Sequence, residues 1–435
     1  MRRLNQYGLE HLLFAAYLIL FAWLVTKIKF FKNSGLTPSQ LIIFFLLKVM
    51  AGIFYGWIGI HYGELAHMVD TWGFYYLSLS ESDLLKTNPQ EFFTTLFQNN
   101  YEHGYDGFLS GKNSWWNDIR GTIFIKLLAV INFFSFGHYY INVIFYSFIT
   151  LIGPIAFYRV MKDVYPTKKL VVLLASFLIP SFLYWTSGIH KDGLVFIALA
   201  LIIYHFYFGL KKKKFSWAAI FSILLSLVII LALRNYLLIL LLPALFAWVL
   251  SNTVQQKPII IFSAVYLLGT LFFFTARYIS PKLDFPGSVV AKQQEFLKLK
   301  GNSAVPVDEV SPTIFSFISN IPQAFSLSTL RPYPSDVKHL LSLAAAAEIN
   351  LLLLTFVLFI FYKRKAIAPT PFILFALFLS FSILFTIGYT VNFLGAIVRY
   401  RSLVLPLLIV PLAANIDWNR LFKHFSGNME IKNDI

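Results

Sequence analysis

The chain has 435 residues, no cysteine and a formal net charge of +16. Hydrophobic residues make up 58% of it and aromatic residues 18%, and the mean hydropathy is +0.70. That is more apolar surface than a water-soluble domain can bury. The lack of cysteine excludes a disulfide framework and any thiolate metal or redox site. Composition therefore predicts an integral membrane protein.

Apolar runs near the length that crosses a bilayer, about 20 residues, recur along the chain. The first run follows Met-Arg-Arg, as the apolar part of a signal sequence would. However, basic residues come after it and no small-residue cleavage site does, so we expect this run to be retained as a span. We count eleven spans, give or take two, which predicts an all-α integral membrane fold. The runs are 8–27, 40–60, 141–158, 170–187, 193–210, 215–233, 236–252, 258–276, 341–362, 370–390 and 402–416.

Most basic residues lie in short connectors between these runs, where the positive-inside bias places them. The charge therefore predicts orientation in a membrane and no binding of nucleic acid. The basic connectors 159–169, 211–214 and 363–365 are separated by even numbers of spans, so they share one face, which we expect to be cytoplasmic. We expect the tail 417–435 on the same side.

The opposite face then carries two long loops, 61–120 and 279–340, and shorter connectors at 185–192 and 234–236. Long loops are usually functional or disordered, and the many aromatic residues of the first loop argue against disorder. That loop holds eight acidic residues and only three basic ones, as expected outside. Any chemistry is therefore expected on the outer face.

The apolar run 122–135 is too short to cross a membrane and contains Lys126 and Asn132. We predict an interfacial helix that dips into the outer leaflet. The first outer loop with its interfacial helices then covers 61–140, within a polytopic transmembrane domain of residues 1–416.

Asp70 follows directly on a predicted span, so its carboxylate lies near the membrane surface and could accept a proton from an incoming hydroxyl. It could equally cap a short helix that begins at Thr71.

The seam between runs 170–187 and 193–210 contains His190, Lys191 and Asp192. Ionisable residues there are costly in lipid unless they serve a site or a pathway. Lys191 can act as a point charge or pair with Asp192. His190 has no second ligand at helical spacing, so a metal role is not expected.

The order of these features resembles the GT-C superfamily of polytopic glycosyltransferases, which use polyprenyl-phosphate-linked sugars. In that family a span leads into a large outer loop that opens with an acidic residue and aromatics. A short apolar surface helix and a span ending in basic residues follow. The matching parts here are run 40–60, Asp70 with Tyr75 and Tyr76, run 122–135, and run 141–158 with Arg159 and Lys162.

Three further segments resemble parts of bacterial lipid-linked-sugar transferases and polysaccharide polymerases: 180–192, 330–334 with Glu348, and 399–406. The chain departs from the family in one motif. Many members carry a pair of acidic residues in the first outer loop, whereas here Asp70 is followed by Thr71 and the nearest upstream acidic residue is Glu64. The general base is therefore either Asp70 or Glu64, and Asp70 is our candidate. We also expect no soluble outer domain after the last span.

A transferase of this kind must deprotonate an acceptor hydroxyl and hold the departing phosphate. Arginine suits the phosphate because its planar fork matches two oxygens and stays charged. Our candidates for phosphate binding are Arg331, Arg399, Arg401 and Lys191, with Arg234 as a further outer-face cation. Glu348 is either a second base or, as we favour, a helix-start carboxylate that complements the macrodipole.

These features predict a membrane glycosyltransferase that moves a sugar from a polyprenyl-phosphate-linked donor to a glycan, lipid or protein acceptor. We expect it at the outer face of a bacterial inner membrane, in contact with membrane lipids. No Asp-x-Asp pair or Gly-rich phosphate loop lies near a cytoplasmic connector, which argues against a nucleotide-sugar donor. The sequence indicates no particular cofactor, and it leaves open whether a divalent cation is required.

Two alternatives stay open as well: a polymerase of lipid-linked oligosaccharide repeat units, and a non-catalytic transporter or flippase-type protein. A transporter predicts ionisable residues near the middle of spans. None occurs in runs 170–187, 215–233, 236–252, 258–276 and 370–390.

Overall fold

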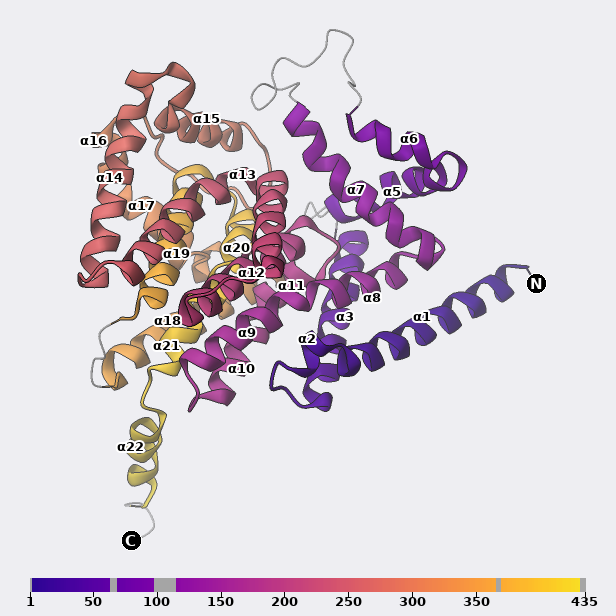
Figure 1. The fold of residues 1–435 in the computed structure, drawn as a ribbon, viewed down its shortest axis with the longest axis horizontal. Coiled ribbons are helices and arrows are strands. Elements are labelled where there is room, and N and C mark those ends of the chain that lie inside the picture. Colours follow the sequence, from indigo (N-terminus) through magenta and orange to yellow (C-terminus); the bar gives the residue numbers. More distant parts are fainter. Residues whose placement is uncertain (1, 63–68, 98–114, 365–368, 431–435) are drawn as a thin grey trace. The chain divides into compact units, whose positions relative to one another are not determined.

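The computed structural model describes residues 2–62, 69–97, 115–364 and 369–430 (Figure 1). Over these residues the protein is helical, without a strand, and has only two isolated backbone bridges. Eight helices are long and apolar enough to cross a membrane, or up to ten if each of two bent helix pairs counts as one span. The chain is thus a multi-pass membrane protein, and the predicted all-helical class is confirmed.

The sequence predicts eleven spans, more than the eight to ten that the structure offers. One reason is that runs 215–233 and 236–252 lie on one helix, α13 (Trp217–Thr253). Its backbone leaves helical geometry at Arg234, with φ −150° and ψ 68°. A straight helix of 37 residues would extend about 55 Å, well beyond the apolar core of a bilayer at about 30 Å. The predicted connector at 234–236 is therefore a kink inside a helix.

Two other runs belong to bent pairs. Run 170–187 is divided between α10 (Lys169–Phe177) and α11 (Pro180–Ser187), which meet at 50°. Run 402–416 falls mostly on α21 (Leu405–Ala414), which meets α20 (Leu394–Ser402) at 63°. Pro180 begins α11, as expected of a residue that lacks the N–H needed to continue a helix.

The chain packs as two compact units. Unit 1 comprises Met1–Val160 and Leu183–Leu238, and unit 2 comprises Met161–Phe182 and Ile239–Ile435. The chain passes between the units within α9, α11 and α13. Besides parts of α9 (Ile152–Val164), α11 and α13, unit 1 contains α1 (Arg2–Lys27), α2 (Lys29–Lys32), α3 (Pro38–His61), α5 (Val69–Thr87), α6 (Pro89–Thr94), η1 (Thr95–Phe97), α7 (Trp115–Ser135), α8 (Tyr139–Thr150) and α12 (Lys191–Lys212).

Unit 2 holds the remaining helices. They are α14 (Pro258–Ile279), η2 (Pro281–Leu283), α15 (Phe285–Leu297), α16 (Ile314–Ser319), α17 (Ile321–Phe325), η3 (Ser326–Leu330), η4 (Pro334–Asp336), α18 (Leu340–Tyr362), α19 (Pro371–Thr390) and α22 (Trp418–Glu430), together with α10, α20 and α21.

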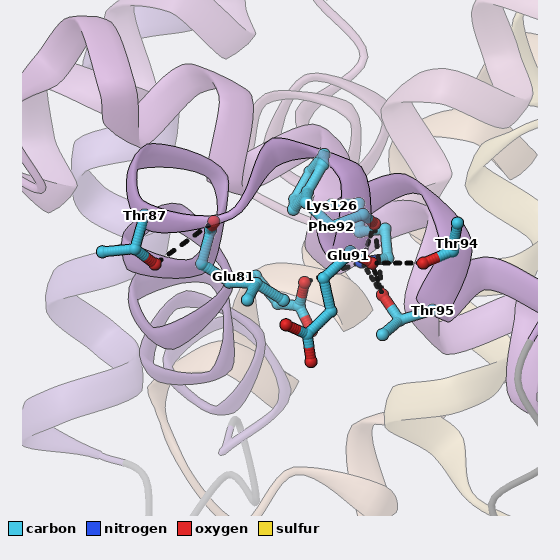
Figure 2. Close-up of polar contacts among 8 residues, drawn as sticks. Glu81, Thr87, Glu91, Phe92, Thr94, Thr95 and Lys126 are labelled. Atoms are coloured by element: carbon cyan, nitrogen blue, oxygen red, sulfur yellow. Dashed lines mark hydrogen bonds and ion pairs between the residues drawn. The ribbon is translucent and has the colours of Figure 1, made fainter.

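Within unit 1, the first loop folds into helices that pack on one another. The predicted short helix 122–135 forms most of α7, which lies along α5 (Figure 1). Its Lys126 is buried, and the ammonium donates to Glu81 Oε2 at 2.7 Å, the Phe92 carbonyl at 2.6 Å and Thr95 Oγ1 at 2.8 Å (Figure 2). All three N–H donors of the lysine are thereby used. Lys126 thus ties α5, α6 and η1 to α7.

Asn132, the other polar residue that marked this run, is also buried. Its amide donates to Ser78 Oγ at 2.7 Å and its carbonyl accepts from Asn142 Nδ2 at 2.5 Å. Asn142 also accepts a hydrogen bond from Ser135. The polar residues that make the run a poor span are therefore the ones that fasten α7 to α5 and α8.

In unit 2, the predicted outer loop 279–340 is folded into short helices against α19. Tyr389 in α19 donates its hydroxyl to the Phe317 carbonyl at 2.7 Å. The backbone of this loop also meets the turn after α19, since Val305 N donates to Asn392 O and Leu394 N to Ser303 O, both at 2.9 Å. The segment that leads to Arg331 is thereby fixed to α19 and to the turn that follows it.

Candidate functional site

Asp70 lies in the first described turn of α5, so it is not the cap of a helix that begins at Thr71. Its side chain is 59% exposed. Glu64, the other candidate base, lies outside the described residues. Asp70 is therefore the predicted base whose surroundings the structure defines.

A row of ionisable side chains leads from Asp70 into the interior of unit 1. His190 Nε2 lies 3.7 Å from Asp70 Oδ2, and His190 Nδ1 lies 3.1 Å from Asp192 Oδ2. Arg234 Nη2 donates to the other oxygen of Asp192, Oδ1, at 2.6 Å. We call Asp70, His190, Asp192 and Arg234 the polar row. His190 is 2% exposed and Asp192 0%, so the row begins at an exposed carboxylate and ends at a buried ion pair.

The backbone explains why these residues meet. His190 is the extended residue just before α12, so its side chain and that of Asp192, in the first turn of α12, project to the same side. Arg234 occupies the kink of α13. A buried carboxylate such as Asp192 is costly without a partner, and Arg234 supplies that partner.

The predicted residue Lys191 begins α12 and is half-buried. Its ammonium lies 4.9 Å from the centre of the Phe74 ring, and that ring lies 6.0 Å from the His190 ring. A cation over an aromatic face is attracted by the negative potential of the ring. Lys191 therefore lies beside α5, within reach of the same region as the polar row.

Lys48 holds the seam in place and was missed by the sequence analysis. It lies in the middle of α3, is 2% exposed, and donates to Thr186 O at 3.1 Å and Ser187 Oγ at 3.1 Å. An ionisable residue inside an apolar run is itself a functional signal, and run 40–60 contains this one. On the far side of the seam, Tyr146 in α8 donates its hydroxyl to the carbonyl of His190.

Glycines allow α3 and the seam to approach closely. A Cβ added at Gly188 would lie 2.3 Å from the Tyr55 ring, and one at Gly52 would lie 2.7 Å from Ser187 O. Both distances are shorter than any ordinary contact. Glycine is required at these positions for the seam to pack on α3 as it does.

Tyr75 and Tyr76, the aromatics of the family resemblance, have different surroundings. Tyr75 donates its hydroxyl to Gly137 O at 2.5 Å, and burial, with Tyr76 and Glu10 nearby, raises the pKa of this phenol. Tyr76 is 62% exposed. Tyr75 therefore fastens α5 to the start of α8, whereas Tyr76 is accessible.

The other predicted residues, Arg331, Glu348, Arg399 and Arg401, belong to unit 2. Arg401 is fully buried, and its Nη1 donates to Ser328 O at 3.4 Å and to the carbonyl of Arg331. Its Nε and Nη2 atoms have no hydrogen-bond partner among the described residues. The half-buried Arg331 lies 3.5 Å from Asp336 Oδ1, and the Arg399 guanidinium is 5.7 Å from the Tyr400 ring.

Glu348 corrects one prediction. It lies in the third turn of α18 and not at the helix start, and its Oε2 accepts from the backbone N–H of Ser181 at 2.5 Å. The first N–H groups of a helix lack intrahelical partners, and Ser181 is in the first turn of α11. Glu348 therefore complements the N-terminus of α11, not that of its own helix. Its other oxygen has no hydrogen-bond partner in the described structure.

Chemically, the unit 1 site offers an exposed carboxylate, an imidazole behind it and a buried ion pair that orients the imidazole. Within the described ranges, no group of three or more His, Asp or Glu residues could hold a metal ion. No family model, no curated protein and no solved structure matches this chain. Function is therefore inferred from the site itself.

Proposed function

We propose that this protein is a GT-C-like membrane glycosyltransferase of a bacterial inner membrane. It transfers a sugar from a polyprenyl-phosphate-linked donor to a glycan, lipid or protein acceptor at the outer face. The observation that carries the proposal is the polar row, in which the exposed carboxylate of Asp70 is backed by His190 and a buried Asp192–Arg234 pair. This arrangement suits removal of a proton from a hydroxyl group at the end of apolar helices.

The proposed step begins when Asp70 accepts the proton of the acceptor hydroxyl. The acceptor oxygen then forms a bond to the anomeric carbon of the sugar, and the bond from that carbon to the phosphate oxygen breaks. The electron pair leaves on the phosphate. Asp192 holds Nδ1 of His190, so that Nε2 faces Asp70 and can stabilise or receive the proton.

Cations must stabilise the departing phosphate. Within unit 1, which also contains Asp70, we assign this role to the half-buried Lys191. Arg401 is fully buried and holds the carbonyl of Arg331. Within unit 2, Arg401 therefore fixes the backbone position of Arg331.

The test is transfer of radiolabelled sugar from a polyprenyl-phosphate donor in membranes that contain the protein. General base catalysis contributes on the order of 10²- to 10⁴-fold, so Asp70→Asn is expected to slow transfer by at least about 100-fold. The matched control is Asp83→Asn, which changes an exposed carboxylate on the same helix that pairs with Lys86 at the surface. Transfer by Asp70→Asn at the rate of the Asp83→Asn control would remove Asp70 from the mechanism.

A transporter or flippase is the second candidate, because the structure buries ionisable side chains inside apolar helices. Lys48 is 2% exposed, Glu348 4% and Arg401 0%. Reconstituted liposomes separate the two functions. A transporter moves the labelled lipid-linked sugar to the opposite leaflet and leaves it chemically unchanged, whereas a transferase or a polymerase forms a new glycosidic product.

A further inference from the structure

Three chain segments converge where α18 ends in unit 2. Asn415 Nδ2 donates to Tyr165 Oη at 3.2 Å, and Arg364 N donates to Asn415 O at 3.1 Å. Asp417 N donates to Tyr362 O at 2.8 Å. These bonds hold the connector after α9, the end of α18 and the start of α22 together.

Each of these segments carries a basic side chain, and we call Lys168, Arg364 and Arg420 the basic corner. Burial and the charge of Arg364 both lower the pKa of Lys168, and Asp417 acts in the opposite direction. The Arg420 guanidinium lies 5.8 Å from the Tyr362 ring. Arg364 and Arg420 are exposed. The fold thus brings the like charges of Lys168 and Arg364 close together, and the Asp417 carboxylate offsets their repulsion only in part.

The helix that follows has the pattern of an interfacial helix. Trp418, Leu421 and Phe422 recur at the spacing of one helical face, and Arg420 and Lys423 lie away from it. Trp418 Nε1 donates to Ala413 O at 2.9 Å and Leu421 is buried, so the start of α22 is anchored to unit 2. Phe422 is 62% exposed.

We infer that the basic corner binds the phosphate group of an anionic phospholipid headgroup, with the apolar face of α22 against the same lipid surface. Guanidinium and ammonium groups bind phosphate by charge-assisted hydrogen bonds, and basic clusters at the cytoplasmic ends of spans attract anionic lipids. The exposed apolar face beside the charges selects a lipid over a free anion. This inference does not depend on the proposed enzymatic function.

The test uses the purified full-length protein in detergent, titrated with phosphatidylglycerol while the unfolding temperature is followed. A ligand that binds only the folded state raises that temperature as its concentration exceeds Kd. Removal of one basic charge near a membrane surface is expected to weaken binding about fivefold. We therefore expect Arg364→Gln and Lys168→Gln each to need about five times more phosphatidylglycerol for the same rise in unfolding temperature.

The control variant is Lys257→Gln, which removes an exposed charge of unit 2 that is not part of the basic corner, just before α14, and should titrate as the wild type does. Without anionic lipid, Arg364→Gln should be no less stable than the wild type, because it relieves repulsion with Lys168. Equal titrations of all variants would overturn the site. A rise of equal size with inorganic phosphate or with phosphatidylcholine would overturn its assignment to an anionic lipid.

Discussion

The imidazole of His190 lies between two carboxylates, with Nε2 3.7 Å from Asp70 Oδ2 and Nδ1 3.1 Å from Asp192 Oδ2. The two carboxylates differ in environment, because Asp70 is 59% exposed and Asp192 is 0% exposed. A buried carboxylate that holds one imidazole nitrogen fixes the orientation of the ring and the tautomer. The accessible acid can then exchange a proton with the other nitrogen.

This relationship predicts that His190 and Asp70 act together in accepting the proton of the acceptor hydroxyl. We expect His190→Gln to slow sugar transfer by about 10- to 100-fold, less than Asp70→Asn, because the base itself is retained. The double variant should be no slower than Asp70→Asn alone, since residues that act as a unit are not additive. Measured transfer rates of the two single variants and the double variant check this. Losses that multiply in the double variant would mean that the two side chains act independently.

The Asp192–Arg234 pair should matter for stability. Arg234→Met leaves the carboxylate of Asp192 buried without its guanidinium, which costs about 3–5 kcal/mol. We expect a lower unfolding temperature for Arg234→Met, and partial recovery when Asp192→Asn is added, because the buried charge that lost its guanidinium is then removed. Thermal unfolding of the wild type, Arg234→Met and the double variant in detergent measures both effects. A double variant less stable than Arg234→Met alone would contradict the pairing.

The all-helical membrane class and most span positions could be predicted from the sequence, because apolar length is a local property. The kink at Arg234 could not, since two runs joined by Arg-Asn-Tyr fit a connector as well as a bent helix. Glu348 shows a second limit: its partner Ser181 is 167 residues away in the chain. Residue spacing carries no information about such a contact.

Within the site, the sequence predicted Asp70 and Lys191 and named His190, Asp192 and Arg234 as further candidates. It did not predict that His190 would link the two acids, because that requires α5 to lie beside the start of α12. Lys48 carried a usable signal, a charge inside an apolar run. That signal was missed because the run was treated only as a span.

Lys48 is expected to support the seam on which His190 lies. Lys48→Met keeps a similar shape but leaves Thr186 O and Ser187 Oγ without their buried donor, which costs about 1–3 kcal/mol. We expect a lower unfolding temperature and slower transfer. Lys32→Met, which removes an exposed lysine at the end of α2 in the same unit, is the control and should change neither. A Lys48→Met variant as stable and as active as the control would show that the seam holds without this lysine.

The close approach of Gly188 to Tyr55 gives a prediction that a second substitution can rescue. Gly188→Ala places a methyl group 2.3 Å from the Tyr55 ring, and overpacking of this kind costs about 1–3 kcal/mol. We expect a lower unfolding temperature for Gly188→Ala and partial recovery when Tyr55→Leu makes room. Gly269→Ala in α14 is the control, since a Cβ there meets nothing within 4 Å in the described structure, and it should stabilise the helix by up to about 1 kcal/mol. If Tyr55→Leu lowered the stability of Gly188→Ala further, the ring would not be the source of the strain, and the seam would be held against α3 by other contacts.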